Sequence, residues 1–272
     1  MDPQSCQLGE RPTPPYFFIP DGPVTGDVDP WLSDGWIAHC EAEVREIGGQ
    51  ADRRVSILRR LARRLLLGHA DIPTHLAPLL PIVREMLAEK ERISIADVGG
   101  GFGDNYGILR TVLGAELVDR MEYTVVDNAR SIALGRRLFP DCRFVEELPE
   151  GHFDIVVVVV GTLQYIPKWQ DFLHALKGKG NIVYVARSPL RKSGEGFEVK
   201  QAVCPAKGSH ALEKCGIANV WVVGREELQA IFADWIPIID KFHTSYSSEF
   251  GRLPKEKRNV AYYVAVWAKR AG

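Results

Sequence analysis

The stretch that most constrains the fold of this chain is residues 93–105, Ile-Ser-Ile-Ala-Asp-Val-Gly-Gly-Gly-Phe-Gly-Asp-Asn. Its first six residues predict a short buried strand, and residues 106–113 predict a helix. Glycines between a strand and a helix let the backbone turn sharply and lie close to a ligand. The free N–H groups at the start of the helix add a partial positive charge. We therefore expect a ligand cradle at residues 99–105 of an α/β sheet.

The spacing of the glycines separates two kinds of ligand. Dinucleotide-binding loops follow G-x-G-x-x-G, whereas here the glycines stand at every second position from Gly99, with Asp97 two residues before the first. This pattern resembles motif I of the class I S-adenosylmethionine (SAM) methyltransferases, whose acid faces the ammonium side of the cofactor. A carboxylate suits such a cation and would repel a pyrophosphate. The resemblance implies SAM as the cofactor, bound by Asp97, Gly99, Gly100, Gly101, Gly103 and Asn105. The alternative is a glycine turn in an unrelated α/β sheet.

Composition limits the partners. The chain has 272 residues, a formal net charge of −1 and five cysteines. A charge near zero gives no field that would attract nucleic acid or an anionic membrane, and the cysteines form no C-x-x-C pair that would indicate a metal site. The N-terminus lacks signal-peptide features, and no apolar run reaches the ~20 residues of a membrane span. We expect a cytoplasmic protein without a metal, and leave homo-oligomerisation open.

Residues 1–90 predict an arm and a helical lobe, ahead of a SAM-binding domain at 91–272. Proline, glycine and aspartate dominate residues 1–30, whose apolar cluster at 16–19 is predicted to dock as a tether on the core or as a lid over the substrate. Helices are expected at 37–47, 52–67 and 76–89. The arginines of the second helix form either a solvated face or a site for an anionic substrate such as a nucleotide sugar.

From residue 93 onward, strands and helices alternate, which predicts a doubly wound sheet. The second strand, 122–126, ends in Asp127, whose carboxylate would accept both ribose hydroxyls; the alternative is a helix N-cap. Asn128 beside it is a further candidate for contact with the adenosine. The third strand, 143–145, leads into Glu146, which the resemblance places near the adenine amino group. Glu147 is the next choice, and a solvated turn is the alternative.

The fourth strand, 153–160, is a continuous β-branched run typical of a central parallel strand. Asp154 opens it, far from the expected ligand edge, and is read as structural. The segment that follows, Gly-Thr-Leu-Gln-Tyr-Ile-Pro at 161–167, resembles motif IV of the same methyltransferases, which passes under the cofactor and reaches the substrate. The resemblance implies cofactor contacts from Gly161, Thr162 and Leu163.

A fifth strand, 181–186, ends at Arg187, which is expected either to hold a substrate phosphate or carboxylate or to form a structural ion pair. Residues 189–220 are weakly patterned and predict a functional loop or lid. After a helix at 225–233, strands at 236–245 and 260–267 predict a terminal antiparallel hairpin. Class I methyltransferases end in this way, whereas a dehydrogenase sheet normally ends parallel. The expected fold is a Rossmann-like, doubly wound, seven-stranded, mostly parallel sheet with an antiparallel last strand.

Three segments carry a narrower resemblance: the glycine loop through Tyr106, the Leu-Gln-Tyr-Ile segment, and Ile-Ala-Asn-Val-Trp-Val-Val-Gly-Arg-Glu-Glu-Leu at 217–228. They are similar to a methyltransferase family associated with bacterial surface-polysaccharide synthesis. The Asn-Pro-Pro-Tyr motif of amino-methylating enzymes is absent after the fourth strand, which favours a hydroxyl on a small molecule, sugar or glycan as the acceptor; an anionic acceptor is a further option.

Candidates for the base that takes the hydroxyl proton are His210, His243 and Tyr165, unless the reaction needs no dedicated base. Two alternatives to a methyltransferase stay open at this point. One is an NAD-dependent oxidoreductase, and the other is a SAM-binding scaffold or regulator without catalysis.

Overall fold

The computed structural model describes residues 16–19, 38, 75–159, 161–203, 216–243, 250 and 253–270, with the backbone alone at 16–19, 216 and 243. The predicted arm, apart from 16–19, and the predicted helices at 37–47, apart from residue 38, and 52–67 lie outside the described residues. The division into domains at 90/91 stays a prediction. No helix in the described part of the chain is long and apolar enough to cross a membrane.

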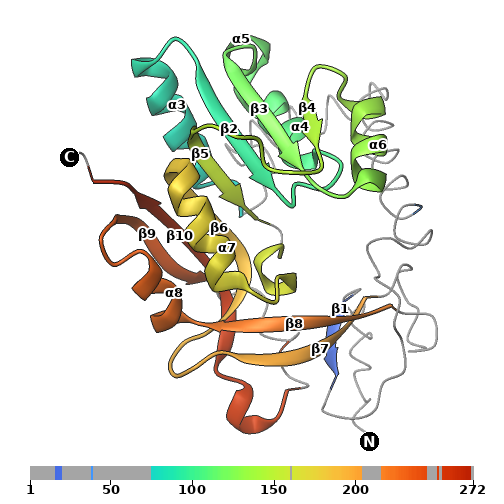
Figure 1. Ribbon diagram of the computed structural model, residues 1–272, viewed down its shortest axis with the longest axis vertical. Helices are drawn as coiled ribbons and strands as arrows, with labels where there is room; N and C mark the ends of the chain where they lie inside the picture. The colour runs from blue at the N-terminus through green and yellow to red at the C-terminus, as the bar shows by residue number, and fades with distance from the viewer. Residues whose placement is uncertain are drawn as a thin grey trace, which may run out of the picture.

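The centre of the molecule is a sheet whose strands follow the order β4-β3-β2-β5-β6-β10-β9 (Figure 1). The strands are β2 (Ile93–Val98), β3 (Met121–Val126), β4 (Arg143–Val145), β5 (Phe153–Val158), β6 (Gly180–Arg191), β9 (Ile236–His243) and β10 (Val260–Ala268). The pairs from β4 to β6 are parallel. β10 is antiparallel to both β6 and β9, between which it lies. The expected seven-stranded, Rossmann-like sheet with an antiparallel last strand is confirmed.

Helices cover both faces of this sheet. They are α3 (Leu79–Glu89), α4 (Asp104–Leu113), α5 (Ala115–Val118), α6 (Ala129–Leu138), α7 (Trp169–Lys179) and α8 (Arg225–Ile231). Alternate residues of each strand enter different cores, because successive side chains of a strand point to opposite faces. Ile155 and Val157 pack in the core under α3 and α4, whereas Val156 and Val158 pack in the core under α7 and α8. This alternation fixes which face each polar residue of the strands can reach.

The structure corrects the expectation of a loop or lid at 189–220. β6 continues to Arg191, and residues beyond it form β7 (Phe197–Val203) and β8 (Gly216–Gly224), an antiparallel pair. β8 joins the end of β6, so the sheet branches there. A third core lies against this pair and includes Val199, Val220 and Leu253. Residues 204–215 of the predicted loop are outside the described part.

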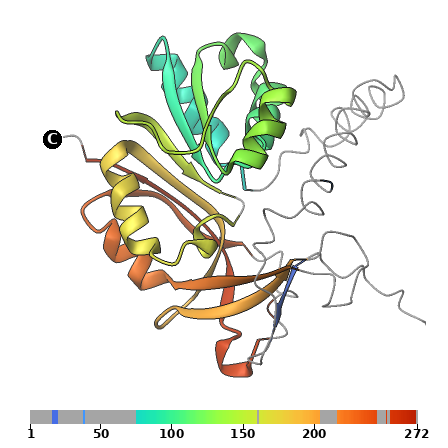
Figure 2. The ribbon, with the colours of Figure 1, turned by 45° about the vertical axis from the view of Figure 1, so that its right-hand side comes forward.

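The N-terminal cluster forms β1 (Tyr16–Ile19), whose backbone pairs antiparallel with β7 at the edge of the branch (Figure 2). Glu227 in the first turn of α8 anchors the other side of the branch. Its Oε2 accepts hydrogen bonds from the N–H groups of Gly196 at 2.9 Å and Gly224 at 3.0 Å. A Cβ on Gly224 would lie 2.4 Å from that oxygen and 3.0 Å from the carbonyl oxygen of Gly194, so this junction favours glycine.

Asp154 has the structural role expected of it. It lies at the amino end of β5, away from the ligand edge, where its carboxylate accepts hydrogen bonds from Lys90 and from the Ser94 backbone and hydroxyl. Partial burial acts to raise the pKa of Asp154, but these hydrogen bonds outweigh it and hold the pKa below its usual value.

Candidate functional site

The strand register brings the predicted ligand residues into one row. Val98 of β2 pairs with Val126 of β3, which pairs with Val145 of β4. Gly99, Asp127 and Glu146 each follow one of these three residues in the chain. All three therefore lie at the carboxyl edge of the parallel strands, where open α/β sheets bind their ligands.

The glycine loop runs from Gly99 to Gly103, which is the N-cap of α4. Gly99, Gly101 and Gly103 have positive φ angles of 73°, 57° and 88°. These values lie in the left-handed region that favours glycine. The residue pattern that predicted a sharp strand-to-helix turn is thus matched by the backbone conformation.

Two glycines of the loop are enclosed and one is open. A Cβ on Gly99 would lie 2.2 Å from Thr162 Oγ1, and one on Gly100 would lie 2.5 Å from Asp97 Oδ2. A Cβ on Gly101 would meet no described atom within 4 Å. The loop is therefore packed against the protein on one side and leaves Gly101 on the side where another molecule can approach.

The segment after β5 packs against the glycine loop. Gly161 has a φ of 84°. The hydroxyl of Thr162 lies 3.2 Å from the carbonyl oxygen of Gly99 and 3.0 Å from that of Val159, and either can accept its proton. Leu163 begins the short 3-10 helix η2 (Leu163–Tyr165) and is completely buried in the core under α7 and α8. Its side chain thus belongs to the core, so a ligand would meet only its backbone.

Asp97 lies beneath the loop and is fully buried. Its Oδ2 accepts hydrogen bonds from the Tyr123 hydroxyl at 2.8 Å and the Asn105 side-chain amide at 3.1 Å. Burial raises the pKa of Asp97 from 3.8 to about 7, against the effect of these two hydrogen bonds. The described structure gives no hydrogen-bond partner to Asp97 Oδ1 or to Asn105 Oδ1.

The carboxylate of Asp127 accepts hydrogen bonds from Gly101 and from Asn128. Its Oδ2 accepts from the Gly101 N–H at 2.8 Å, and its Oδ1 accepts from the backbone and side-chain N–H groups of Asn128 at 2.8 and 2.7 Å. The N-cap of α6 is Asn128, whose Oδ1 accepts from the N–H groups of Arg130 and Ser131. The N-cap of α6 is therefore Asn128, and the alternative that Asp127 is the N-cap is wrong.

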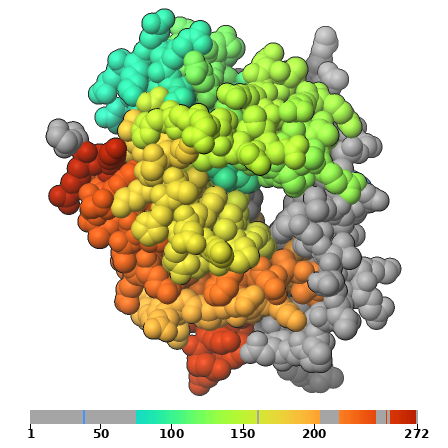
Figure 3. Space-filling view, viewed as in Figure 1, coloured from blue at the N-terminus to red at the C-terminus, as the bar shows by residue number. Residues whose placement is uncertain are grey.

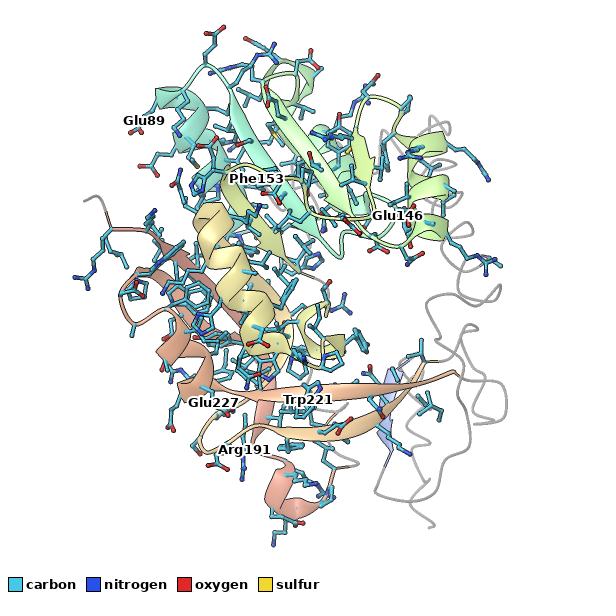
Figure 4. The ribbon with its side chains drawn as sticks, in the orientation of Figure 1. Glu89, Glu146, Phe153, Arg191, Trp221 and Glu227 are labelled. Carbon is cyan, nitrogen blue, oxygen red and sulfur yellow. The ribbon has the colours of Figure 1, made fainter. Side chains whose placement is uncertain are left out.

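Glu146 and Glu147 are both exposed at the end of β4. Figure 4 labels Glu146 at this edge of the sheet. On the face that Figure 3 shows, the described surface is hollowed between the part containing β4 and α6 and the part containing β8. Glu146 is therefore placed where an exposed acid can contact a ligand at the carboxyl edge.

Of the three candidate bases, Tyr165 is the one whose side chain is described. His210 lies outside the described residues, and His243 is the last residue of β9, with its backbone alone described. The hydroxyl of Tyr165 donates to Gln201 Oε1 of β7 at 2.6 Å. Gln164 Nε2 is 3.4 Å from the same oxygen.

Sequence reasoning did not select Gln164, Gln201 or Tyr123 as site residues. Gln164 and Gln201 are 4% and 2% exposed, although glutamine is mostly found at the surface. Gln164 Oε1 has no hydrogen-bond partner among the described residues. The available signal in the sequence was the position of Gln201 between Val199 and Val203, two residues from each, and the prediction of a loop at 189–220 concealed it.

Arg187 occupies the end of the parallel part of β6, as expected, and is half-buried. It has a φ of 57° and falls at an irregularity where β10 passes from pairing with Ala186 to pairing with Ser188. An arginine in the left-handed region is strained. A bulge of this kind commonly re-aims a side chain beside a site.

No protein-family model matches the chain, and no curated protein matches it by sequence. Similar solved structures include an S-adenosylmethionine-dependent methyltransferase from Clostridium acetobutylicum, at 9% identity and a TM-score of 0.48, covering 80% of this chain and 100% of that one. Another is the 1,6-didemethyltoxoflavin-N1-methyltransferase of Burkholderia thailandensis, at 16% identity and a TM-score of 0.43, covering 92% of this chain and 93% of that one. A third is the cyclase SpnF, at 14% identity and a TM-score of 0.46, covering 72% of this chain and 81% of that one. At these values the likenesses carry no argument about activity, and the assignment of the fold rests on the strand order.

Proposed function

We propose that this protein is a SAM-dependent methyltransferase that methylates a hydroxyl group of a small molecule or sugar. The observation that carries the proposal is the glycine loop, which is enclosed at Gly99 and Gly100, open at Gly101, and flanked by Asp97 and Asp127. A loop of this kind admits a ligand against bare backbone at one point only. Two carboxylates beside it favour a ligand that carries positive charge and hydroxyl donors.

The residues present fit the two ends of SAM. Beneath the loop, the unpartnered acceptors Asp97 Oδ1 and Asn105 Oδ1 suit a cationic group that donates hydrogen bonds, directly or through water. At the other end, Asp127 Oδ2 accepts one hydrogen bond and Oδ1 accepts two. Each carboxylate oxygen has about two acceptor sites. Oδ2 is therefore the atom that would take the first ribose hydroxyl, and a second would displace the Asn128 amide from Oδ1.

The cofactor would supply a methyl group already activated by its sulfonium centre. The protein would then have to position the acceptor oxygen in line with the methyl group and keep the reactants together. Tyr165 lies three residues after Thr162, which contacts the loop. Because its hydroxyl proton is directed to Gln201, the oxygen of Tyr165 can accept a hydrogen bond from an acceptor hydroxyl and orient it. We assign Tyr165 this orienting role rather than that of a base.

An NAD-dependent oxidoreductase is the weaker candidate. A buried acid beneath the loop opposes a pyrophosphate, and β10 runs antiparallel at the end of the sheet. The link to surface polysaccharides and an anionic acceptor remain predictions from the sequence, as does a cytoplasmic location. A SAM-binding protein without catalysis differs from an enzyme only in the transfer step, so the experiment has to measure that step separately.

The first experiment measures the melting temperature of the purified chain with S-adenosylhomocysteine, SAM or NAD⁺. A ligand at 100 times its dissociation constant stabilises the folded state by about 2.7 kcal/mol. Stabilisation by the first two ligands and not by NAD⁺ is expected, and the reverse result would refute the proposal. Transfer of tritiated methyl from SAM to fractionated small molecules, glycans and proteins then tests catalysis. Products labelled on nitrogen or carbon alone would refute the hydroxyl acceptor.

A further inference from the structure

The buried group formed by Asp97, Asn105 and Tyr123 has its hydrogen bonds on one side only. Both donors, the Tyr123 hydroxyl and the Asn105 amide, are directed to Asp97 Oδ2. Asp97 and Asn105 are 0% exposed and Tyr123 is 3% exposed. Oδ1 of Asp97 and Oδ1 of Asn105 have no partner among the described residues. An unsatisfied buried acceptor costs about 1–3 kcal/mol, so two of them under a ligand loop require an explanation.

The charges around Asp97 oppose its ionisation. Among the described residues, the charged groups that act on it most are Asp104 at the start of α4 and Asp127 after β3, and both are acidic. Tyr123 on β3 and Cys142 before β4 also face it, and burial raises the pKa of both well above their ordinary values, so both stay neutral near pH 7. A fully buried carboxylate with two neutral hydrogen-bond donors and two acidic neighbours is poorly stabilised. A positive charge on the ligand would supply the stabilisation that the described neighbours of Asp97 do not provide.

We propose that Asp97 exchanges a proton with solvent when the cofactor binds, and that Tyr123 is the positioning residue that keeps this carboxyl group able to ionise. The inference rests on the proposed function, since it takes the charged end of SAM or its product as the ligand. In the free protein the carboxyl group is partly protonated at pH 7 and carries its proton fully at lower pH. The positive end of the bound ligand stabilises the carboxylate, and the proton leaves from the carboxyl O–H to solvent.

The exchange depends on pH and approaches one proton per molecule below pH 7. With a pKa of about 7 in the free protein, Asp97 is about half protonated at pH 7, so binding releases about 0.5 proton per molecule. Below pH 7 the affinity falls by up to tenfold per pH unit, because the proton must be removed before the ligand is bound. The positive group of the cofactor would thus be bound in exchange for a proton.

Tyr123 has a separable effect. Its hydroxyl stabilises the carboxylate of Asp97 through Oδ2, and the Asn105 amide is the other donor there. Removing the hydroxyl in Tyr123→Phe should leave Asp97 protonated to a higher pH. The pH at which affinity begins to fall then moves upward. A residue that mattered for packing alone would weaken binding equally at every pH.

The test is isothermal titration of the full chain with S-adenosylhomocysteine at pH 7 in two buffers of different ionisation enthalpy. The dissociation constant is also measured from pH 5.5 to 8.5. Protons exchanged by the ligand's own amine are common to all variants and cancel against Asp97→Asn. We expect wild type to release about 0.5 proton more than Asp97→Asn at pH 7. The affinity of Asp97→Asn should not vary with pH beyond the ligand's own titration.

The outcomes separate this inference from the proposed function. Tight binding with equal proton release in wild type and Asp97→Asn overturns the proton exchange and leaves the proposed function intact. No binding by wild type at any pH overturns both. If Asp97→Asn does not fold, Tyr123→Phe decides: an upward shift of the pH profile supports the inference, and an unshifted profile overturns it.

Discussion

The substitution Gly101→Ala separates ligand contact from folding more cleanly than any other change in the loop. A Cβ at Gly101 would meet no described atom within 4 Å, whereas one at Gly99 would overlap Thr162 and one at Gly100 would overlap Asp97. The cost to the folded state is therefore limited to holding alanine at a φ of 57°, which is about 1–2 kcal/mol. We expect a loss of a few degrees in melting temperature.

The cost to binding has a different origin. If the ligand lies against the bare backbone of Gly101, the new methyl group occupies its space. Overpacking by one methyl group costs about 1–3 kcal/mol, which corresponds to a roughly 5- to 150-fold weaker affinity. Calorimetry with S-adenosylhomocysteine measures this loss directly, and the melting temperature of the same sample measures the loss of stability.

Gly114→Ala is the matched control. Gly114 follows α4, at the end of the helix away from the loop, and has φ 85° and ψ 162° with nothing within 4 Å of its Cβ position. This backbone region is available almost only to glycine and costs about 1–3 kcal/mol for other residues. The control should lose at least as much stability as Gly101→Ala and keep wild-type affinity. Unchanged affinity in Gly101→Ala, or an equal loss in both variants, would refute the placement of the ligand.

Substitutions at three acidic residues test the charged groups. Asp127→Ala leaves the Gly101 N–H without its acceptor and should weaken S-adenosylhomocysteine binding by about tenfold or more, whereas Asp127→Asn retains an acceptor and should lose less; equal losses in calorimetry would contradict this. Burial raises the pKa of Asp97 from 3.8 to about 7, so the folded state keeps a proton that the unfolded state has lost between these values. The contribution of Asp97 to stability is therefore full below about pH 4 and falls by about 4 kcal/mol as the pH rises to 7; urea unfolding of Asp97→Asn should lack this decrease. Burial acts to raise the pKa of Asp240, but hydrogen bonds from Tyr263 and Arg225 outweigh it and lower the pKa. This contribution is present above about pH 4 and is lost as the pH falls through the lowered value, so Asp240→Asn should be less stable than wild type at pH 7 and equally stable at pH 2; a constant difference would be evidence against the ion pair.

Local patterns predicted the parts of the fold in which each strand carries its own signal. The β-branched run of β5 and the glycines after β2 follow from burial and from backbone conformation, both properties of adjacent residues. The branch of the sheet was missed for the opposite reason. Pro189 and the buried Gln201 break the strand pattern, and the pairing of β7 with β8 spans a long connection that no local periodicity reveals.

The candidate site divides in the same way. The positions of Asp127 and Glu146 were predictable, because both stand immediately after a strand and parallel strands share one carboxyl edge. The contact between Asp97 and Tyr123 depends on register. Asp97 pairs with Val125, which places Tyr123 two residues back on the same face of the neighbouring strand. The register between strands is set by packing of the whole sheet. The sequence alone therefore shows Tyr123 as a tyrosine in a strand and does not indicate its contact with Asp97.

The strained residue Arg187 lies where β6 passes from pairing with β5 to pairing with β8. Up to Ala186 this strand pairs with β5 on one side and β10 on the other, and beyond Ser188 it pairs with β8 and β10. If β6 were regular at this point, its pairing register with β10 would continue without a shift, and the β7–β8 pair would extend in the direction of the parallel strands. The left-handed residue at Arg187 interrupts that register, at a cost of about 1–2 kcal/mol. η2 packs against both β6 and β8, and Tyr165 at its end contacts Gln201 of β7. The irregularity thus falls where β6 passes from pairing with β5 to pairing with β8, beside the segment that contacts both the glycine loop and Gln201.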